Sequence, residues 1–240
     1  MKPVAIFQHT DIGRPGSVVD ILDALGIPMQ RVDIYKGDAV PAVPDDFSGL
    51  VFMGGPMGVG DSHDWLEHER ALIRLADAQD IPVAGHCLGA QQLAVALGAR
   101  VQRNHRPEIG WQNILVEAHP SAHEWWGAAP QTQLLTFQWH SDTFDLPLNA
   151  HRIATSSHCA NQAFVVRDLH VGMQSHFEMT ADLVHDYYQR NGAFLRREYA
   201  SGNPAVTSVE ETLADLEART AAMKIVLQRV YTRWARGLKG

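Results

Sequence analysis

The feature that most constrains this chain is the stretch of residues 81–97, IPVAGHCLGAQQLAVAL, in which a short apolar run leads into a cysteine and then into a helical pattern. Ile81 to Ala84 has the length and apolarity of a central strand in a parallel sheet. Gly85 and Gly89 flank Cys87 as GxCxG, the cysteine form of a nucleophile elbow, because glycines tolerate a strained backbone and a close helix. The stretch therefore predicts a strand, a sharp turn and a helix.

Such a turn places the sulfur of Cys87 at the amino end of a helix. There the helix dipole and unpaired backbone amides favour the thiolate over the thiol, whose ordinary pKa is about 8.5. The same amides can receive an oxyanion. The pattern is short, however, and a cysteine among apolar residues is also a common small core residue. The remaining motifs decide between these two interpretations.

Strand-like and helix-like segments alternate up to residue 98. We expect strands at residues 4–7, 31–35, 50–53 and 81–84, and helices at 17–25, 64–78 and from 88 onward. This alternation predicts a parallel sheet with helices on both faces. Active sites in such sheets lie beyond the carboxyl ends of the strands, which is where GGPMG (54–58) and GHCLG (85–89) both fall.

Shorter β-rich segments follow residue 100 and are expected to form meander-like strands. They span residues 110–117, 134–139, 151–156, 163–167 and 171–175, with a short helix at 120–126 and another helix at 181–188. The chain thus predicts a catalytic domain over residues 1–200 and an appended helical segment over residues 201–240.

The appended segment is expected to be one helix, opened by a capping box of Ser208 and Glu211. An apolar stripe then recurs in steps of three and four residues: Leu213, Leu216, Thr220, Met223, Leu227, Val230 and Trp234. We expect this amphipathic helix to pack on the catalytic domain, with a homodimer seam as the alternative.

Composition and charge exclude several classes of partner. The net charge is −7 and the basic residues are scattered, so we expect no nucleic-acid partner. The start, MKPVAIFQH, lacks the pattern of a signal peptide, and no run is long enough for a membrane span. Two cysteines do not make a disulfide framework. We therefore expect a cytoplasmic enzyme with no membrane partner.

Two further motifs carry polar chemistry. QWHSDTFDLP (138–147) contains His140, and GMQSHFE (172–178) contains His176 and Glu178, which the alternation of a strand would place on one face. A cysteine hydrolase needs an imidazole to take and return the thiol proton, and a carboxylate to orient it. One of thirteen histidines is by itself more often structural, but its pairing with Glu178 downstream of an elbow cysteine favours catalysis.

Taken together, the motifs resemble those of class I, triad-type glutamine amidotransferases, particularly the stand-alone branch related to the amidotransferase domain of GMP synthase. The matching segments are GGPMG (54–58), GHCLGAQ (85–91), EIGW (108–111), WHSDTFDLP (139–147) and QSHFE (174–178), in the order of that family. The resemblance implies an α/β, three-layer, flavodoxin-like fold with a mostly parallel central sheet, extended here by the C-terminal helical segment.

The resemblance also implies residue roles. Cys87 would attack the γ-carboxamide of glutamine, form a γ-glutamyl thioester and release ammonia. His176 would act as base and then acid, with Glu178 as its orienting partner. The backbone amides of Gly55 and Leu88 would form the oxyanion hole.

The amino and carboxylate groups of glutamine would be held by a further set of residues. By resemblance these are Gly54, Gln91, His140, Ser141 and Asp142. No cofactor and no metal ion is implied.

Three residues depart from the pattern of the family. His86 stands where an aliphatic or aromatic residue is usual, Ser175 where an aromatic residue is usual, and Phe177 where proline is usual. They adjoin the proposed catalytic residues and could alter the pocket or the presentation of His176. None of them removes a reacting group.

Other polar groups favour structural interpretations. His119 and His123 are four residues apart, but Pro120 intervenes and no third metal ligand is evident. Cys159 has no elbow and is interpreted as a core thiol. The segment 61–64 is interpreted as a solvated helix start.

Three functions remain open. The chain has no GxxxxGK[ST] phosphate loop and no SGGxDS loop, so we expect it not to activate an acceptor unaided. It would then be a glutaminase that feeds ammonia to a separate synthetase subunit. The same triad could instead hydrolyse γ-glutamyl amides or peptides, and the last alternative is a regulatory module whose catalysis has lapsed.

Overall fold

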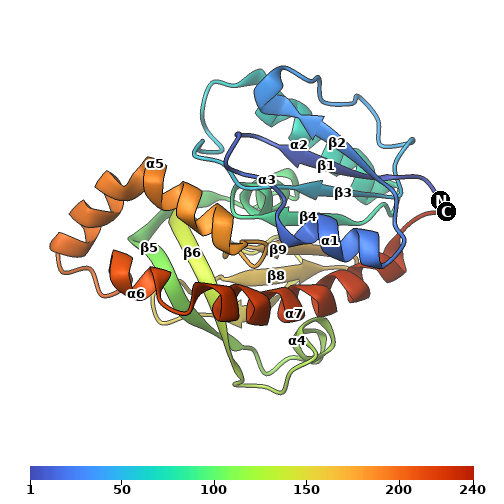
Figure 1. Cartoon of the computed structure of the whole chain (residues 1–240). Helices are drawn as coiled ribbons and strands as arrows, with labels where there is room; N and C mark the ends of the chain where they lie inside the picture. Colours follow the sequence, from blue (N-terminus) through green and yellow to red (C-terminus); the bar gives the residue numbers. More distant parts are fainter.

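A nine-stranded sheet runs through the molecule in the order β2-β1-β3-β4-β9-β8-β7-β5-β6 (Figure 1). The computed structural model describes residues 1–240. The strands are β1 (Val4–Gln8), β2 (Met29–Asp33), β3 (Gly49–Phe52), β4 (Val83–His86), β5 (Val101–Val116), β6 (Gln133–Phe144), β7 (Ala150–Thr155), β8 (Ala163–Val166) and β9 (His170–Met173).

One half of the sheet is parallel and the other half is antiparallel. Strands β2, β1, β3, β4 and β9 pair in parallel, whereas the four pairings that connect β9, β8, β7, β5 and β6 are antiparallel. The expected α/β fold with helices on both faces is confirmed, but its sheet is parallel only in the half formed by β1 to β4 and β9. Short connections, such as the one between β8 and β9, permit only antiparallel neighbours.

Helices cover both faces of the sheet. They are α1 (Ser17–Ala24), α2 (Asp64–Ala78), α3 (Leu88–Ala96), α4 (Pro120–Trp126), α5 (Ala181–Ala200), α6 (Val209–Leu213) and α7 (Leu216–Trp234), with 3-10 turns at Ile34–Lys36 and Ala235–Gly237. No helix combines the length and the apolar character that crossing a membrane would require.

The alternation of side chains along β1 divides the apolar core into two parts. Val4 and Ile6 belong to the core that includes residues of α1, α4, α5 and α7, whereas Ala5 and Phe7 belong to the core beneath α2 and α3. All four side chains are fully buried. The sheet is therefore the middle of three layers.

The C-terminal segment forms two helices where the sequence predicts one. The Ser208 hydroxyl accepts a hydrogen bond from the Glu211 amide at 3.0 Å, as a capping box requires. Helix α6 then stops because Ala214 is extended and Asp215 adopts a left-handed φ of 50°. Beyond this break, α7 packs against α1, α4 and α5 of the same chain (Figure 1).

Several elements are longer than the sequence predicts. Strands β5 and β6 extend beyond the expected residues 110–117 and 134–139 and pair along most of their length, with an irregularity between Arg103 and Glu108. Helix α5 continues to Ala200 instead of ending near residue 188. Polar and charged residues interrupt, in these extensions, the periodic apolar pattern from which strands and helices are recognised.

Candidate active site

The turn between β4 and α3 holds Cys87 in a strained conformation. Its φ is 50° and its ψ is −107°, outside the regions that L-residues ordinarily occupy, and it is the N-cap of α3. A Cβ on Gly89 would lie 2.1 Å from the carbonyl oxygen of Phe52, and one on Gly85 would lie 2.5 Å from the carbonyl of Gly89. Both glycines are therefore required by close packing, and the turn has the shape of the predicted elbow.

His176 and Glu178 are brought into direct contact. His176 Nδ1 lies 2.7 Å from Glu178 Oε1, and both residues are 2% exposed. The expected strand through residue 175 ends earlier, at Met173, and His176 instead forms an isolated bridge with Phe137, whose carbonyl accepts its amide at 2.8 Å. The pair is thus fixed by a bridge to β6 and not by a continuous strand.

Gly54 lies against both Cys87 and His176. A Cβ built on Gly54 would be 3.0 Å from His176 Cε1 and 3.5 Å from Cys87 Cβ. A side chain at this position would therefore press on the imidazole of His176, while its contact with Cys87 would be an ordinary one. The structure therefore brings together Cys87, His176 and Glu178, which the sequence places far apart.

Gln174 is a polar neighbour of the sulfur and is not among the expected site residues. Its Nε2 donates to Cys87 Sγ at 3.6 Å, and its Oε1 accepts from Gln91 Nε2 at 3.1 Å. Both glutamines are buried. The QSHFE motif contained the signal, because residues 174, 176 and 178 alternate along the chain.

Charges shift the pKa values of the buried pair. Burial alone would lower the pKa of His176, but the negative charges of Glu178 and Cys87 outweigh it and hold this pKa well above the usual 6.5. Burial alone would raise the pKa of Glu178, but His176 and then His86 outweigh it and hold this pKa far below its usual range. The site therefore favours an imidazolium at His176 paired with the Glu178 carboxylate.

A cavity of about 520 Å³ opens directly above the sulfur. Its walls come from the glycine loop after β3, from β6 and from α5. The lining residues include Gly55, Pro56, Met57, Gly58, Cys87, Gln91, Trp139, His140, Ser141, Asp142, His176, Tyr187, Arg190, Asn191 and Phe194. Four of the expected substrate-binding residues, Gln91 and the segment 140–142, thus face this space, and Gly54 lies beside its floor.

The backbone amides of Gly55 and Leu88 lie on neighbouring segments. Leu88 is the first residue of α3, where backbone amides have no acceptor within the helix. A Cβ on Gly55 would be 3.2 Å from the Leu88 side chain, so the glycine loop passes close to the helix start. Gly55 lines the cavity, and Leu88 directly follows Cys87, which also lines it.

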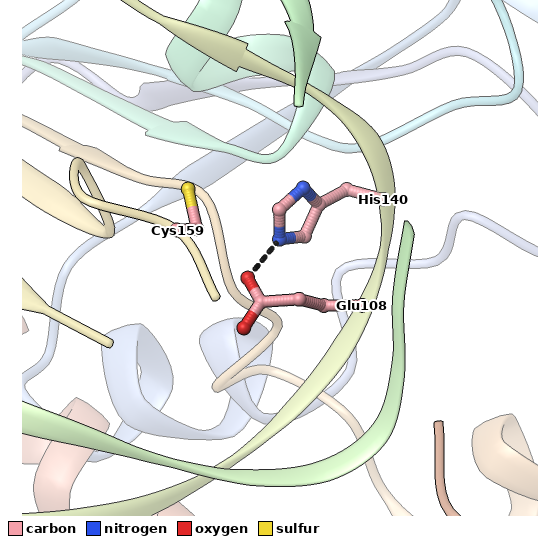
Figure 2. A group of neighbouring side chains, drawn as sticks. All are labelled: Glu108, His140 and Cys159. Atoms are coloured by element: carbon pink, nitrogen blue, oxygen red, sulfur yellow. Dashed lines mark hydrogen bonds and ion pairs between the residues drawn. The ribbon is translucent and has the colours of Figure 1, made fainter. Parts of the chain in front are cut away.

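His140 is held at the wall of the cavity by Glu108 (Figure 2). His140 Nε2 lies 2.9 Å from Glu108 Oε2, and its Nδ1 lies 2.9 Å from the carbonyl oxygen of Asp142. Gln162 and Ser156 also donate to the Glu108 carboxylate, at 2.7 and 3.0 Å. The carboxylate is fully hydrogen-bonded and fixes the orientation of the imidazole.

Cys159 lies beside this pair (Figure 2), and the ligand atoms of the three residues lie within 4.8 Å of one another. Burial raises the pKa of the Cys159 thiol to about 11, so the sulfur keeps its proton at neutral pH. A metal ion would have to displace that proton and the donors on Glu108. The cluster is better described as a hydrogen-bonded support for the cavity wall.

The histidines at 119 and 123 have structural contacts. His119 Nδ1 accepts from the Ser121 amide at the start of α4, and its ring stacks on His151 at 4.2 Å. His123 Nδ1 lies 2.9 Å from the carbonyl oxygen of Ala128. Both histidines serve the turns around α4.

The three departures from the family pattern are all buried. Phe177 packs against Trp126 with ring centroids 5.2 Å apart, and the Ser175 hydroxyl has no hydrogen-bond partner. His86 contacts both Glu178 and Tyr231. No pattern in the sequence points to Tyr231, which lies on α7.

Comparisons with known proteins agree with this fold. Residues 17–194 match the family model of glutamine amidotransferase class I. The crystal structure of a glutamine amidotransferase from Methylobacillus flagellatus aligns over 100% of this chain and 96% of its own, with 41% identity and a TM-score of 0.95. A glutamine amidotransferase-like protein of Salmonella typhimurium is 29% identical over 86% of this chain and 87% of its own length. Gamma-glutamyl peptidase 4 of Arabidopsis thaliana is 26% identical over 77% of this chain and 75% of its own length. The chain therefore belongs to the class I glutamine amidotransferase family.

Proposed function

We propose that this protein hydrolyses the γ-carboxamide of glutamine and releases ammonia, with Cys87 as nucleophile. The observation that carries the proposal is the elbow cysteine beside a buried His176–Glu178 pair, at the floor of one cavity. Nucleophile, base and orienting carboxylate are the parts that acyl transfer by a cysteine requires.

The geometry suggests the following sequence of steps. The Cys87 thiolate attacks the amide carbon, and the amides of Gly55 and Leu88 stabilise the resulting oxyanion. The His176 imidazolium then donates its proton to the leaving nitrogen, so that ammonia departs and a γ-glutamyl thioester remains. A water molecule, deprotonated by His176, attacks the thioester and releases glutamate.

The residues around the cavity suggest how glutamine is held. Gln91 and the segment 140–142 line the space above Cys87, and His140 is fixed by Glu108. These groups would hold the amino and carboxylate groups of the substrate. The ammonia would pass to a separate synthetase subunit, as the resemblance to the amidotransferase domain of GMP synthase suggests.

A second candidate substrate class is favoured by the size of the cavity. A volume of about 520 Å³ is larger than a single amino acid fills, and Trp139, Tyr187 and Phe194 form part of its wall. An apolar or aromatic group on the amide nitrogen could occupy this part. Hydrolysis of γ-glutamyl amides or peptides would use the same thioester chemistry, and one relative is a γ-glutamyl peptidase.

One experiment separates these candidates. Ammonia and glutamate release is measured from glutamine and from a panel of γ-glutamyl dipeptides, with Cys87→Ala as control. Release confined to glutamine supports the glutaminase, and faster release from dipeptides supports the peptidase. Turnover that survives in Cys87→Ala contradicts both mechanisms, and no turnover of any substrate favours the lapsed module.

A further inference from the structure

The Glu178 carboxylate has a second buried partner besides His176. His86 Nδ1 lies 2.9 Å from Glu178 Oε2, while His176 Nδ1 lies 2.7 Å from Oε1. His86 is fully buried and is the last residue of β4, directly before Cys87. Each oxygen of the carboxylate is therefore held by a different imidazole.

His86 is itself fixed by the C-terminal helix. Its Nε2 lies 2.8 Å from the hydroxyl of Tyr231 on α7, and the two rings stack with centroids 6.0 Å apart. Tyr231 is fully buried and also packs edge-on against Trp234 at 5.5 Å. A continuous chain of hydrogen bonds thus runs from α7 through β4 to the carboxylate.

The protons of this chain can be assigned from its chemistry. Burial raises the pKa of the Tyr231 hydroxyl well above its usual value of 10, so the hydroxyl keeps its proton and can donate a hydrogen bond to His86 Nε2. The pKa of Glu178 is held far below its usual range, so the carboxylate has no proton of its own and His86 Nδ1 donates to Glu178 Oε2. The carboxylate, accepting from both sides, cannot rotate away from His176 without breaking a buried hydrogen bond.

We propose that His86 and Tyr231 are positioning residues of the active site, which lock the Glu178 carboxylate against His176 and tie helix α7 to the reacting groups. Neither residue lines the cavity, so neither contacts the substrate. The proposal rests on the proposed function, because it assigns His86 and Tyr231 to support of the same triad.

The variants His86→Asn and His86→Leu form a matched pair for the test. Asparagine can place an amide N–H close to the position of Nδ1, whereas leucine of similar size offers no donor. The rate of Cys87 alkylation by iodoacetamide reports the reactive thiolate without any substrate. We expect His86→Leu to slow alkylation about tenfold or more, and His86→Asn to remain within about threefold of the wild type.

Turnover supplies a second readout. Because His86 lies outside the cavity, His86→Leu should lower kcat with KM nearly unchanged. Tyr231→Phe should lower kcat less, by about threefold. In the double variant it should lower kcat no further than His86→Leu alone, because the two residues act in series. Leu227→Ala, a buried change on the same helix, is the control for loosened packing and should leave the alkylation rate unchanged.

The proposal is overturned if His86→Asn and His86→Leu slow alkylation equally. It is also overturned if Leu227→Ala slows alkylation as much as Tyr231→Phe does, when each variant is measured equally far below its own thermal unfolding midpoint. Additive effects in the double variant would also contradict it. A protein whose Cys87 reacts with the expected pattern but which turns over neither glutamine nor dipeptides would refute the proposed function and leave this inference standing.

Discussion

At the scale of single residues, the charge of Glu178 determines the state of His176. Burial disfavours the imidazolium, and the carboxylate at 2.7 Å reverses that preference. Glu178→Gln keeps the shape of the side chain and removes the charge. The pKa of His176 should then fall, and kcat/KM should decrease by about a thousandfold, because the amide also permits the wrong tautomer.

This prediction is checked by kcat/KM across pH, with Asp77→Asn as the matched control. Asp77 pairs with His170 at 3.1 Å, outside the cavity. The control should leave kcat/KM within about twofold, since it touches no reacting group. Equal kcat/KM values for Glu178→Gln and the wild type would show that Glu178 takes no part in the mechanism.

The same pair makes the stability of the fold depend on pH. The folded pKa of Glu178 is lowered, so its contribution is present above the unfolded value of about 4.3 and is lost as pH falls through the folded pKa. The folded pKa of His176 is raised, so its contribution is present below about 6.5 and is lost as pH rises through the folded pKa. The pair therefore contributes fully between these two pH values.

Urea unfolding at a series of pH values measures this effect. The wild type should lose more stability than Glu178→Gln when the pH is raised from about 5.5 to above the folded pKa of His176, because the variant lacks the charge that raises that pKa. Parallel stability curves for the two proteins would show that the pair contributes nothing to folding.

At the scale of elements, the elbow depends on the absence of a side chain at position 89. A Cβ on Gly89 would lie 2.1 Å from the carbonyl oxygen of Phe52, a backbone atom that cannot turn aside. Gly89→Ala should therefore push α3 away from β3 and lower the free energy of unfolding by about 3 kcal/mol. The displaced helix start would also lower the reactivity of Cys87.

The measurement is the urea midpoint, together with the rate of Cys87 alkylation. Gly60→Ala is the control, because nothing lies within 4 Å of a Cβ at that position. It should change neither quantity. An unchanged free energy of unfolding in Gly89→Ala would show that α3 and β3 are not closely packed at this position.

The elements also show what a sequence can and cannot specify. The elbow and the parallel strands were predictable, because apolar runs and glycines are local signals. The break between α6 and α7 was not, because the left-handed conformation of Asp215 leaves no pattern in the sequence. Tyr231 was missed for another reason: its partner His86 lies 145 residues away, and only the packing of α7 on the sheet brings them together.

At the scale of the whole molecule, α7 completes the core on one face of the sheet. Its apolar stripe is buried within the chain: Leu216, Thr220, Met223, Leu227, Val230 and Trp234 are at most 6% exposed. The stripe packs against α1, α4 and α5 of the same chain, so we expect it to stabilise that chain and not to join two chains. The helix should therefore stabilise the single chain directly.

Two variants of α7 test this role. Leu227→Ala removes a fully buried side chain and should lower the free energy of unfolding by about 2–5 kcal/mol. Ile225→Ala, on the same helix but 56% exposed, should change it by less than about 0.5 kcal/mol. If the stripe instead joined two chains, the unfolding midpoint would rise with protein concentration, and Leu227→Ala would abolish that rise. Suppose that the unfolding midpoint is independent of protein concentration and that Leu227→Ala lowers the free energy of unfolding while Ile225→Ala does not. This result would establish that α7 stabilises the chain to which it belongs.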